Sequence, residues 1–355
     1  HAEMLRECGL LHQDELDRIR PGLEDIAAAH ARGDWWVTLE MEDGQPALET
    51  LLTAKSGAAG ARRHAGRSRN DQVLAALRLY LREAVESLAE DGRQLADALD
   101  TLAREQGAVA LPGYTHMQQA MPSSVALWAG GFAAEIRDDV DALRHSHRRI
   151  LKNPLGSAAG YGTPRLPVNR DLTRKRLDFP ANHEPVTAVQ LSRGKAEAEV
   201  LFQVALLMQD LGRLASDLLL YYTREFGFVE LPDDFTTGSS IMPQKRNPDV
   251  FELVRGRTAT AQACLIEVLG VTAKLPSGYH RDLQLIKAPL FRSIDLCGES
   301  LRIMAAAVPR IRFRPERIRM DEDIHAAEQA NALVASEGIP FREAYRKVAQ
   351  RLRKD

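Results

Sequence analysis

The sequence has few cysteines and few aromatic residues. Its three cysteines, Cys8, Cys264 and Cys297, are far apart and odd in number. They form neither a disulfide framework nor a zinc-binding pattern, and they fit a reducing compartment, so we expect a cytoplasmic protein. Aromatic residues make up only 6% of the chain, whereas alanine and leucine are plentiful. Alternating, strand-like patterns are hard to find, and this favours an all-α protein.

The chain also lacks a strong excess of charge and a long apolar run. Its net charge is −2 over 355 residues, which argues against a basic surface for nucleic acid. No apolar run approaches the roughly 20 residues that a membrane helix needs, and no basic-then-apolar leader opens the chain. We therefore expect neither nucleic acid nor a membrane as partner. Because the sequence starts at His1 within a helical pattern, we expect a segment before His1, and one after Asp355, to be missing.

Five long segments carry apolar residues at the spacing of an amphipathic helix. They cover residues 71–107, 123–151, 194–226, a stretch that starts at Pro248, and 286–307. Such helices exceed the average of about 11–12 residues and need to bury their apolar faces against one another. We predict an elongated central bundle of long helices at 66–310, with small helical domains at 1–65 and 311–355. Broad apolar faces at 205–211 and 218–222 are wider than one seam needs and predict further packing between subunits.

Chemically useful side chains lie in the breaks between these segments. In "HAGRSRNDQ", residues 64–72, the side chains of Ser68, Arg69 and Asn70 lie beside the free N–H groups of a helix start. A hydroxyl, a guanidinium and an amide in that position would suit a carboxylate ligand. A plain N-cap is the alternative, because serine, asparagine and aspartate all favour that position.

The second break is "LPGYTHMQQAMP", residues 111–122. We expect Pro112 and Gly113 to turn the chain. Three polar side chains then cluster before the next helix: Thr115, His116 and Gln118. A histidine in this setting is a candidate for proton transfer. The alternative is a structural or solvated histidine.

The third break is "GSSIMPQKRNPD", residues 238–249. Gly238 permits backbone motion, Ser239 offers an oxygen, Lys245 a positive charge and Asn247 a neutral donor. Serine is a very weak base in water. It could act as one only if backbone N–H groups, a helix terminus or Lys245 stabilised its alkoxide. The alternative is a polar loop with an exposed cation.

The fourth break is "GYHRDLQLIK", residues 278–287. Its Tyr279, Gln284 and Lys287 could face one ligand. Gln284 and Lys287 are three residues apart and would be neighbours on a helix. A solvated helix start is the alternative.

Taken together and in this order, the four segments resemble the argininosuccinate lyase family of the fumarase/aspartase superfamily. "GRSRNDQ", "GYTHMQ", "GSSIMPQKRNPD" and "YHRDLQLIK" are similar to that family's motifs. "NPLGSAAGYG" and "GIPFREAY" resemble further stretches of the same enzyme. The resemblance therefore extends over nearly the whole chain.

The resemblance implies a homotetramer with a twenty-helix bundle, whose sites draw on three subunits. It implies elimination of argininosuccinate to arginine and fumarate, in arginine biosynthesis, with no metal or organic cofactor. Ser239 would be the base, Lys245 and Asn247 would stabilise the carbanion, and His116 would be held by Glu252. The implied ligands of this small-molecule substrate are Ser68, Arg69, Asn70, Thr115, Gln118, Arg193, Asn247, Tyr279, Gln284 and Lys287.

Two stretches depart from the family pattern. Gln45 stands where the family has a histidine, and residues 182–195 keep Arg193 but little else. These changes concern the amine end of the substrate more than its succinyl end. Another carbon–nitrogen lyase acting on a different N-substituted succinate therefore stays open. So does a non-catalytic relative like the delta-crystallins, although the presence of His116 and Ser239 disfavours it.

Overall fold

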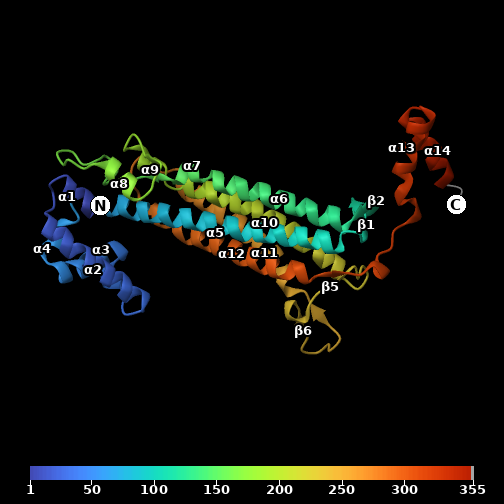
Figure 1. Ribbon diagram of the computed structural model, residues 1–355, viewed down its shortest axis with the longest axis horizontal. Helices are drawn as coiled ribbons and strands as arrows, with labels where there is room; N and C mark the ends of the chain where they lie inside the picture. The colour runs from blue at the N-terminus through green and yellow to red at the C-terminus, as the bar shows by residue number, and fades with distance from the viewer. Residues whose placement is uncertain (353–355) are drawn as a thin grey trace. The chain divides into compact units, whose positions relative to one another are not determined.

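The computed structural model describes residues 1–352, and five long helices dominate it (Figure 1). Each corresponds to one of the five segments expected from the sequence, so the all-α prediction is confirmed. Their ends differ from the expected ones by a few residues, which is normal for helix termini. The five are α5 (Arg69–Gln106), α6 (Val125–His145), α10 (Lys195–Tyr222), α11 (Asp249–Thr272) and α12 (Lys287–Ala307).

Shorter elements precede, connect and follow these helices. The further α-helices are α1 (Ala2–Glu7), α2 (Gln13–Ala31), α3 (Gly44–Ser56), α4 (Ala58–Arg62), α7 (His147–Ile150), α8 (Arg170–Arg176), α9 (Ala188–Leu191), α13 (Ala326–Glu337) and α14 (Phe341–Leu352). Single 3₁₀ turns occur at Leu39–Met41, Asp233–Phe235, Arg281–Gln284, Val308–Arg310, Pro315–Arg317 and Glu322–His325. Strands form four pairs: β1 (Ala110–Thr115) with β2 (Gln118–Ser124), β3 (Lys152–Asn153) with β4 (Ala181–Asn182), β5 (Val229–Glu230) with β8 (Arg312–Phe313), and β6 (Thr237–Gly238) with β7 (Arg246–Asn247).

The chain divides into two compact units. The first contains residues 1–86, 144–201 and 264–291, and the second contains 87–143, 202–263 and the residues from 292 onward. The boundaries fall inside the five long helices, so each of these helices contributes to both units. The three-part division expected from the sequence, with borders near residues 65 and 310, stays a prediction.

Helix α5 shows why these segments are helical. It runs for 38 residues without a proline. Its buried apolar side chains recur every three or four positions, except where Gly92 falls between Leu88 and Leu95; they are Leu74, Leu77, Leu81, Val85, Leu88, Leu95, Leu99 and Leu102. Its one glycine, Gly92, lies where α6 approaches closely. A Cβ atom there would be only 2.5 Å from Val140 Cγ2. The amphipathic stripe and the small residue therefore allow α5 to pack tightly against a neighbouring helix.

Contacts within each unit show that the long helices form a bundle. In the first unit, the rings of Tyr80 on α5 and Phe291 on α12 lie 5.1 Å apart. In the second, the Trp128 indole of α6 donates a hydrogen bond of 2.9 Å to Asp217 of α10. The first unit also has a small core between α1 and α4, around Met4, Leu5, Ile19 and Leu52. Its apolar contacts hold the N-terminal helices together.

The β1–β2 hairpin corrects one expectation. Pro112 and Gly113 do not turn the chain, because both lie within β1, opposite Pro122 and Met121. The turn is at His116 and Met117, whose φ angles are +54° and +60°. Gly113 is needed for strand pairing instead, since a Cβ atom there would lie 2.9 Å from the Met121 carbonyl oxygen. Proline and glycine resemble a turn in sequence, and local pattern alone does not reveal their partner strand.

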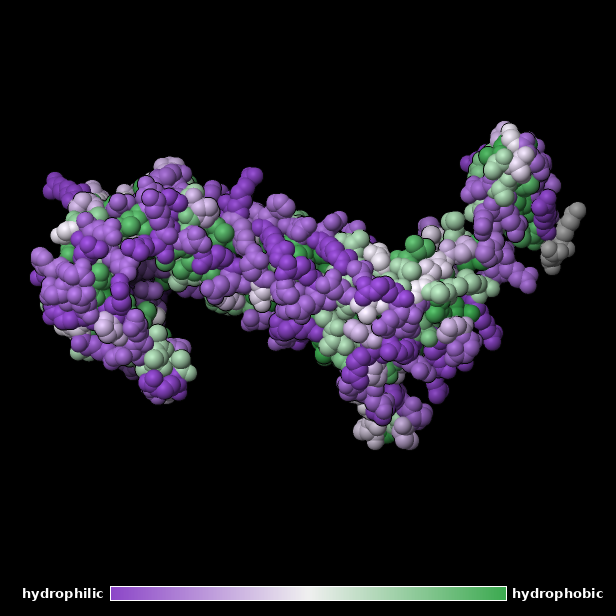
Figure 2. Space-filling view, viewed as in Figure 1, coloured by the Kyte–Doolittle hydropathy of each residue, from purple (hydrophilic) through white to green (hydrophobic). Residues whose placement is uncertain are grey.

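Hydrophobic and hydrophilic side chains are interspersed on the face of the helices that Figure 2 displays. Several large apolar side chains of α10 and α11 are exposed, among them Phe202, Leu253, Ile266 and Leu269. Within residues 1–352, none of the helices is both long and apolar enough to cross a membrane.

Candidate active site

In the first unit, five of the predicted site residues line one cleft of about 330 Å³. They are Arg69, Asn70, Arg193, Tyr279 and Gln284. They come from the start of α5, from the segment before α10 and from the loop before α12. The cleft also contains Glu42, Asp43 and Arg281, which the sequence did not single out as site residues. The sequence breaks at 64–72 and 278–287 thus meet at one place.

The start of α5 is fixed by the buried carboxylate of Asp71. Its Oδ1 accepts a hydrogen bond from the Ser68 backbone N–H at 2.9 Å, and its Oδ2 accepts from the N–H groups of Gly156 and Ala158 at 3.0 and 2.9 Å. Burial raises the pKa of Asp71, although these three donors oppose the shift. The carboxylate therefore ties the "GRSRNDQ" segment to the "NPLGSAAGYG" segment.

Ser68 and Asn70 differ in how much of their side chain is free. Ser68 Oγ accepts a hydrogen bond from the Asn70 backbone N–H at 3.3 Å, as the capping alternative requires. The Asn70 amide group has no hydrogen bond among residues 1–352. Asn70 thus offers a donor and an acceptor at the cleft.

Arg193 connects three of the lining residues. Its guanidinium lies 5.1 Å from the centroid of the Tyr279 ring, and its Nη1 donates to the Asn70 carbonyl oxygen at 3.4 Å. The Tyr279 hydroxyl in turn accepts a hydrogen bond of 2.8 Å from Gln284 Nε2. Burial lowers the pKa of Arg193, and Glu197 opposes that shift. We call Asn70, Arg193, Tyr279 and Gln284 the arginine wall.

A buried ion pair that the sequence analysis missed lies behind the arginine wall. Glu197 is 0% exposed and Arg78 is 1% exposed, and their nearest charged atoms are 3.5 Å apart. Glu197 also accepts a hydrogen bond of 2.6 Å from the Gly194 N–H. Arg78 is a charged residue within the apolar stripe of α5. Because charged residues are rarely buried without a partner, this position in the sequence could have predicted a buried acidic partner.

Lys287 is close to the arginine wall but does not line the cleft. It is the first residue of α12 and is half-buried. Burial, and then the charge of Arg193, lower the pKa of its ammonium group, while Asp43 opposes the shift. Of the three residues expected to face one ligand, Tyr279 and Gln284 line the cleft and bind each other, whereas Lys287 is not part of the lining.

Gln45 lies next to the start of α5. The Gln72 amide can hydrogen-bond to both Arg67 and Gln45 in one orientation, in which its oxygen accepts from the Arg67 guanidinium at 2.8–3.0 Å. Its nitrogen then donates to Gln45 Oε1 at 3.3 Å. Asp43, beside Gln45, caps α3 by accepting from the Gln45 N–H and lies 3.5 Å from Arg69. The departure at residue 45 is thus linked to the cleft through Asp43, which is part of its lining.

In the second unit, His116 lies at the exposed tip of the β1–β2 hairpin, together with Thr115 and Gln118. The side chains of His116 and Glu252 make no hydrogen bond or ion pair within the described chain. The pairing of these two residues therefore stays a prediction.

Ser239 lies in a loop that is closed by strands β6 and β7, where Gly238 pairs with Arg246. Its Oγ accepts hydrogen bonds from the backbone N–H groups of Ile241 at 3.4 Å and Met242 at 3.1 Å. This is one of the arrangements that could stabilise a serine alkoxide. It also has the form of an ordinary serine turn.

The end of this loop and the hairpin tip share a second cleft, of about 880 Å³. Its lining includes Lys245, Asn247 and Glu252, as well as Met117, the neighbour of His116. Asn247 Nδ2 donates to Thr237 Oγ1 at 3.4 Å. Two predicted residues from the third break, and Glu252 of α11, thus face the same space as the turn of the second break.

The predicted residues therefore fall into two groups that belong to different units. Ser68, Arg69, Asn70, Arg193, Tyr279, Gln284 and Lys287 belong to the first unit, and Thr115, His116, Gln118, Ser239, Lys245, Asn247 and Glu252 to the second.

Comparison with known proteins identifies the family. A family described as Lyase matches residues 2–263. The argininosuccinate lyase of Sorangium cellulosum is 44% identical over 98% of this chain and 81% of its own length. That of Bacteroides thetaiotaomicron is 41% identical over 98% of this chain and 78% of its own.

Solved structures of other lyases have a similar fold. EDDS lyase in complex with formate has a TM-score of 0.87 at 28% identity, and the match covers 98% of this chain and 69% of that one. A fumarate lyase from Mesorhizobium sp. BNC1 shares the fold, with a TM-score of 0.79 at 22% identity over 98% of this chain and 79% of that one. From the motifs, the helical bundle and these relatives, the chain belongs to the argininosuccinate lyase family.

Proposed function

We propose that this protein is a carbon–nitrogen lyase that cleaves argininosuccinate to arginine and fumarate, a reaction of arginine biosynthesis. The 44% identity to an argininosuccinate lyase over almost the entire chain supports this activity. The observation that carries the chemistry is the position of Ser239. Its Oγ accepts from two backbone N–H groups, which is what a serine needs in order to act as a base.

The proposed reaction begins when Ser239 removes a proton from the carbon beside a succinyl carboxylate. The electron pair left on that carbon is delocalised into the carboxylate, where Lys245 and Asn247 would stabilise it. The pair then forms the double bond of fumarate and expels the nitrogen, which takes up a proton handled by His116, with Glu252 as its partner. Because the carboxylate itself accepts the charge, we propose that no metal or organic cofactor takes part.

We propose that the arginine wall binds the substrate, together with Ser68, Arg69 and Lys287. Guanidinium, ammonium and amide donors suit the carboxylates of an N-substituted succinate. Thr115 and Gln118 would bind from the hairpin tip. The observation that supports this assignment is the cleft in which Arg69, Asn70, Arg193, Tyr279 and Gln284 meet.

A second candidate is a lyase acting on another N-substituted succinate. Gln45 and residues 182–195 depart from the family pattern, and EDDS lyase has a fold very similar to that of this chain. The succinyl chemistry would be the same in both cases. Only the amine that leaves would differ.

We further propose a cytoplasmic homotetramer in which residues 66–310 form the shared bundle and each site takes segments from several copies. The sequence located the contact faces at 205–211 and 218–222, but Leu207, Leu211 and Leu218 of those stretches are fully buried within the single chain. Exposed apolar side chains remain on α10, at Phe202 and Leu206, and larger exposed fractions occur on α11, where Leu253 is 64% and Ile266 is 66% exposed. Such a face on one helix suits a contact with another copy.

The activity is tested by incubating the protein with argininosuccinate and a panel of N-substituted succinates, while fumarate absorbance is followed. Argininosuccinate should give the highest kcat/KM. A higher value for another succinate would support the second candidate. No fumarate from any of them would overturn the proposed function.

Sharing of sites between copies is tested by complementation. His116→Asn and Ser239→Ala are each expected to be inactive alone. If the two residues meet across subunits, dissociating the variants and reassembling them together should restore some activity, because some sites then carry neither change. No recovery in mixed tetramers verified by mass would place both residues in one chain's site.

A further inference from the structure

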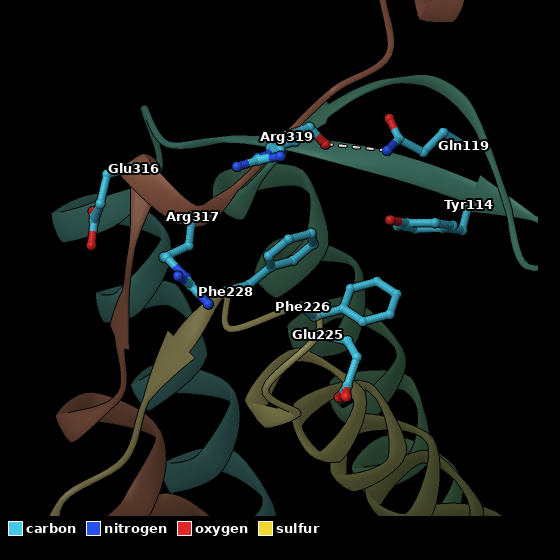
Figure 3. A pocket seen from close by; sticks show the side chains of 8 residues that line it. All are labelled: Tyr114, Gln119, Glu225, Phe226, Phe228, Glu316, Arg317 and Arg319. Atoms are coloured by element: carbon cyan, nitrogen blue, oxygen red, sulfur yellow. Dashed lines mark hydrogen bonds between the residues drawn. The ribbon is translucent and has the colours of Figure 1, made fainter.

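A third cleft, of about 450 Å³, lies in the second unit beside the β1–β2 hairpin (Figure 3). It is outside both clefts described above. Its walls come from the hairpin, from the segment after α10 and from residues 316–319. Its lining includes Tyr114, Gln119, Phe226, Phe228, Arg317 and Arg319. The volume is within the range of small-molecule sites.

The floor of this cleft is aromatic. The rings of Phe226 and Phe228 lie 5.1 Å apart and nearly perpendicular, and the Tyr114 ring lies 6.0 Å from Phe226. Packed rings of this kind offer an apolar surface of ring faces and edges to a ligand. A ligand with a planar apolar body would therefore fit against them.

The polar groups around this floor favour an anion. Arg319 has no acidic partner among residues 1–352, and its guanidinium lies on the same side of the Phe228 ring as the hairpin in Figure 3. The Arg317 guanidinium lies against Gly227, where a Cβ atom would be 3.1 Å from Arg317 Nε. Within residues 1–352 its Nη2 donates only to the Arg224 carbonyl oxygen, at 3.3 Å. The Tyr114 hydroxyl points toward the space around the Phe228 ring. Burial, and then the charge of Asp321, raise the pKa of Tyr114, so its hydroxyl remains a donor.

The two acidic residues of the lining do not cancel these charges. Glu316 is paired with Arg314, whose Nε is 3.0 Å from its carboxylate. The Glu225 carboxylate points away from Tyr114 and the Phe226 ring in Figure 3. The lining of the space above the rings is therefore mainly donors and positive charge, and the negative charge of Asp321 acts on it from outside the lining, at Tyr114.

We propose that this cleft is a regulatory site for a small carboxylate with a flat apolar body. Its carboxylate would bind Arg319 and Arg317 through charge-assisted hydrogen bonds and the Tyr114 hydroxyl through a third, while its body would lie on Phe226 and Phe228.

The cleft is coupled to the hairpin tip through Gln119. The Gln119 amide donates to the Arg319 carbonyl oxygen at 3.1 Å and accepts from the Asp321 N–H at 3.0 Å. Gln119 is paired with Tyr114 across the hairpin, and only the Thr115–Gln118 pair lies between them and the turn that carries His116. A ligand that fixes Tyr114 and Arg319 thus restricts the base of this turn. This consequence for turnover depends on the proposed function, whereas binding does not.

Binding is tested on the intact protein with sodium benzoate as probe and benzyl alcohol as its uncharged analogue. Trp35→Phe and Trp36→Phe leave Trp128 as the single tryptophan. Its ring is 5.8 Å from Tyr221, which packs 5.5 Å from Phe228. Benzoate should change Trp128 fluorescence saturably, and fumarate should not displace it. Benzyl alcohol should bind at least tenfold more weakly.

Arg319→Gln should weaken benzoate binding at least tenfold and leave kcat without benzoate unchanged. Arg342→Gln, which removes an exposed arginine of α14, is the control with the same change of charge and should bind normally. Equal affinity in the two variants, or displacement of benzoate by fumarate, would overturn the site.

Benzoate should also change kcat at least twofold in the unmodified protein and not in Arg319→Gln. Binding without that change would overturn the regulatory role. If the protein forms no fumarate at all, the fluorescence measurement still decides whether the site exists.

Discussion

The arginine wall and the Ser239 loop contrast in how they are held. Arg193 is 4% exposed, stacks on Tyr279, and lies in front of the buried Arg78–Glu197 pair. In the loop, by contrast, Ile241 is 83% exposed and Lys245 is also exposed. Ser239 is positioned mainly by two backbone N–H groups. Side-chain packing fixes the first region, whereas local backbone geometry fixes the second.

This difference separates two kinds of effect. A residue that is held by a buried network cannot be changed without disturbing the fold, because an unpaired buried charge is costly. A residue in an exposed loop can be changed with little effect on stability, because it buries little surface. Variants of Arg193 and of the buried Arg78–Glu197 pair should therefore alter stability and substrate affinity together. Variants of the loop should alter turnover alone.

The largest effect is expected from Ser239→Ala. Loss of a group that acts in the transition state should lower kcat by about 10³-fold or more. The midpoint of thermal unfolding should stay within about 2 °C, since the side chain fills no core position. Fumarate absorbance and a thermal melt measure the two quantities. Ser240→Ala is the neighbouring control and should keep most of the activity. Near-normal turnover of Ser239→Ala would assign the base to another residue.

Glu197→Gln should have the next largest effect, and it should act on stability. Removing this carboxylate leaves Arg78 buried without its partner, which costs about 3–5 kcal/mol. The change should appear as a lower midpoint of urea unfolding and, because Arg193 is no longer balanced, as a raised KM. Glu199→Gln is the matched control. Its partner Arg149 is exposed, so the cost should stay below about 1 kcal/mol. Similar midpoints for the two variants would show that the buried pair is not what stabilises this region.

A smaller, pH-dependent effect is expected at Asp139, in the second unit. Burial, and then the negative charges of Asp210, Glu135 and Asp138, raise the pKa of Asp139 to about 7. Between pH 4 and pH 7 the unfolded chain has released this proton while the folded chain still holds it. The free energy of unfolding should therefore decrease as pH rises through this range.

Asp139→Asn should remove that decrease. The variant should unfold at about the same temperature as the original protein near pH 4 and a few °C higher at pH 8. Thermal melts at several pH values measure this difference. Glu105→Gln, a change at an exposed carboxylate of α5, should leave the pH dependence as it was. A parallel decrease in Asp139→Asn and in the original protein would contradict the assignment.

The smallest change is expected from Gln45→His. An amide donates and accepts hydrogen bonds but does not take up a proton near pH 6.5, as a histidine can. Because Gln45 accepts from Gln72, next to Arg67, its replacement should alter the ratio of kcat/KM between argininosuccinate and other N-substituted succinates by a few-fold. The affinity for fumarate in the reverse direction should change much less. Equal changes for fumarate and for the amine would contradict a role limited to the leaving group.

The sequence by itself predicted the five long helices, because their apolar spacing and lack of interior proline are local properties. It also pointed to the breaks in which the polar residues gather, and to Ser239 with backbone donors as one possible means of activation. The Gly238–Asn247 loop closes on itself within ten residues, so the pattern and the structure refer to the same short piece of chain.

Only the tertiary structure decided which breaks meet. Asp71 binds N–H groups 85 and 87 residues away, and Arg78 meets Ser192 114 residues away. A charged residue such as Arg78 contradicts the apolar pattern of its helix until its distant partner, Glu197, is known. The β1–β2 hairpin likewise depends on the pairing of Pro112 with Pro122. Local spacing specifies helices through contacts between residues three or four positions apart. The arginine wall and the aromatic cleft beside the β1–β2 hairpin depend instead on contacts between distant segments, which only packing brings together.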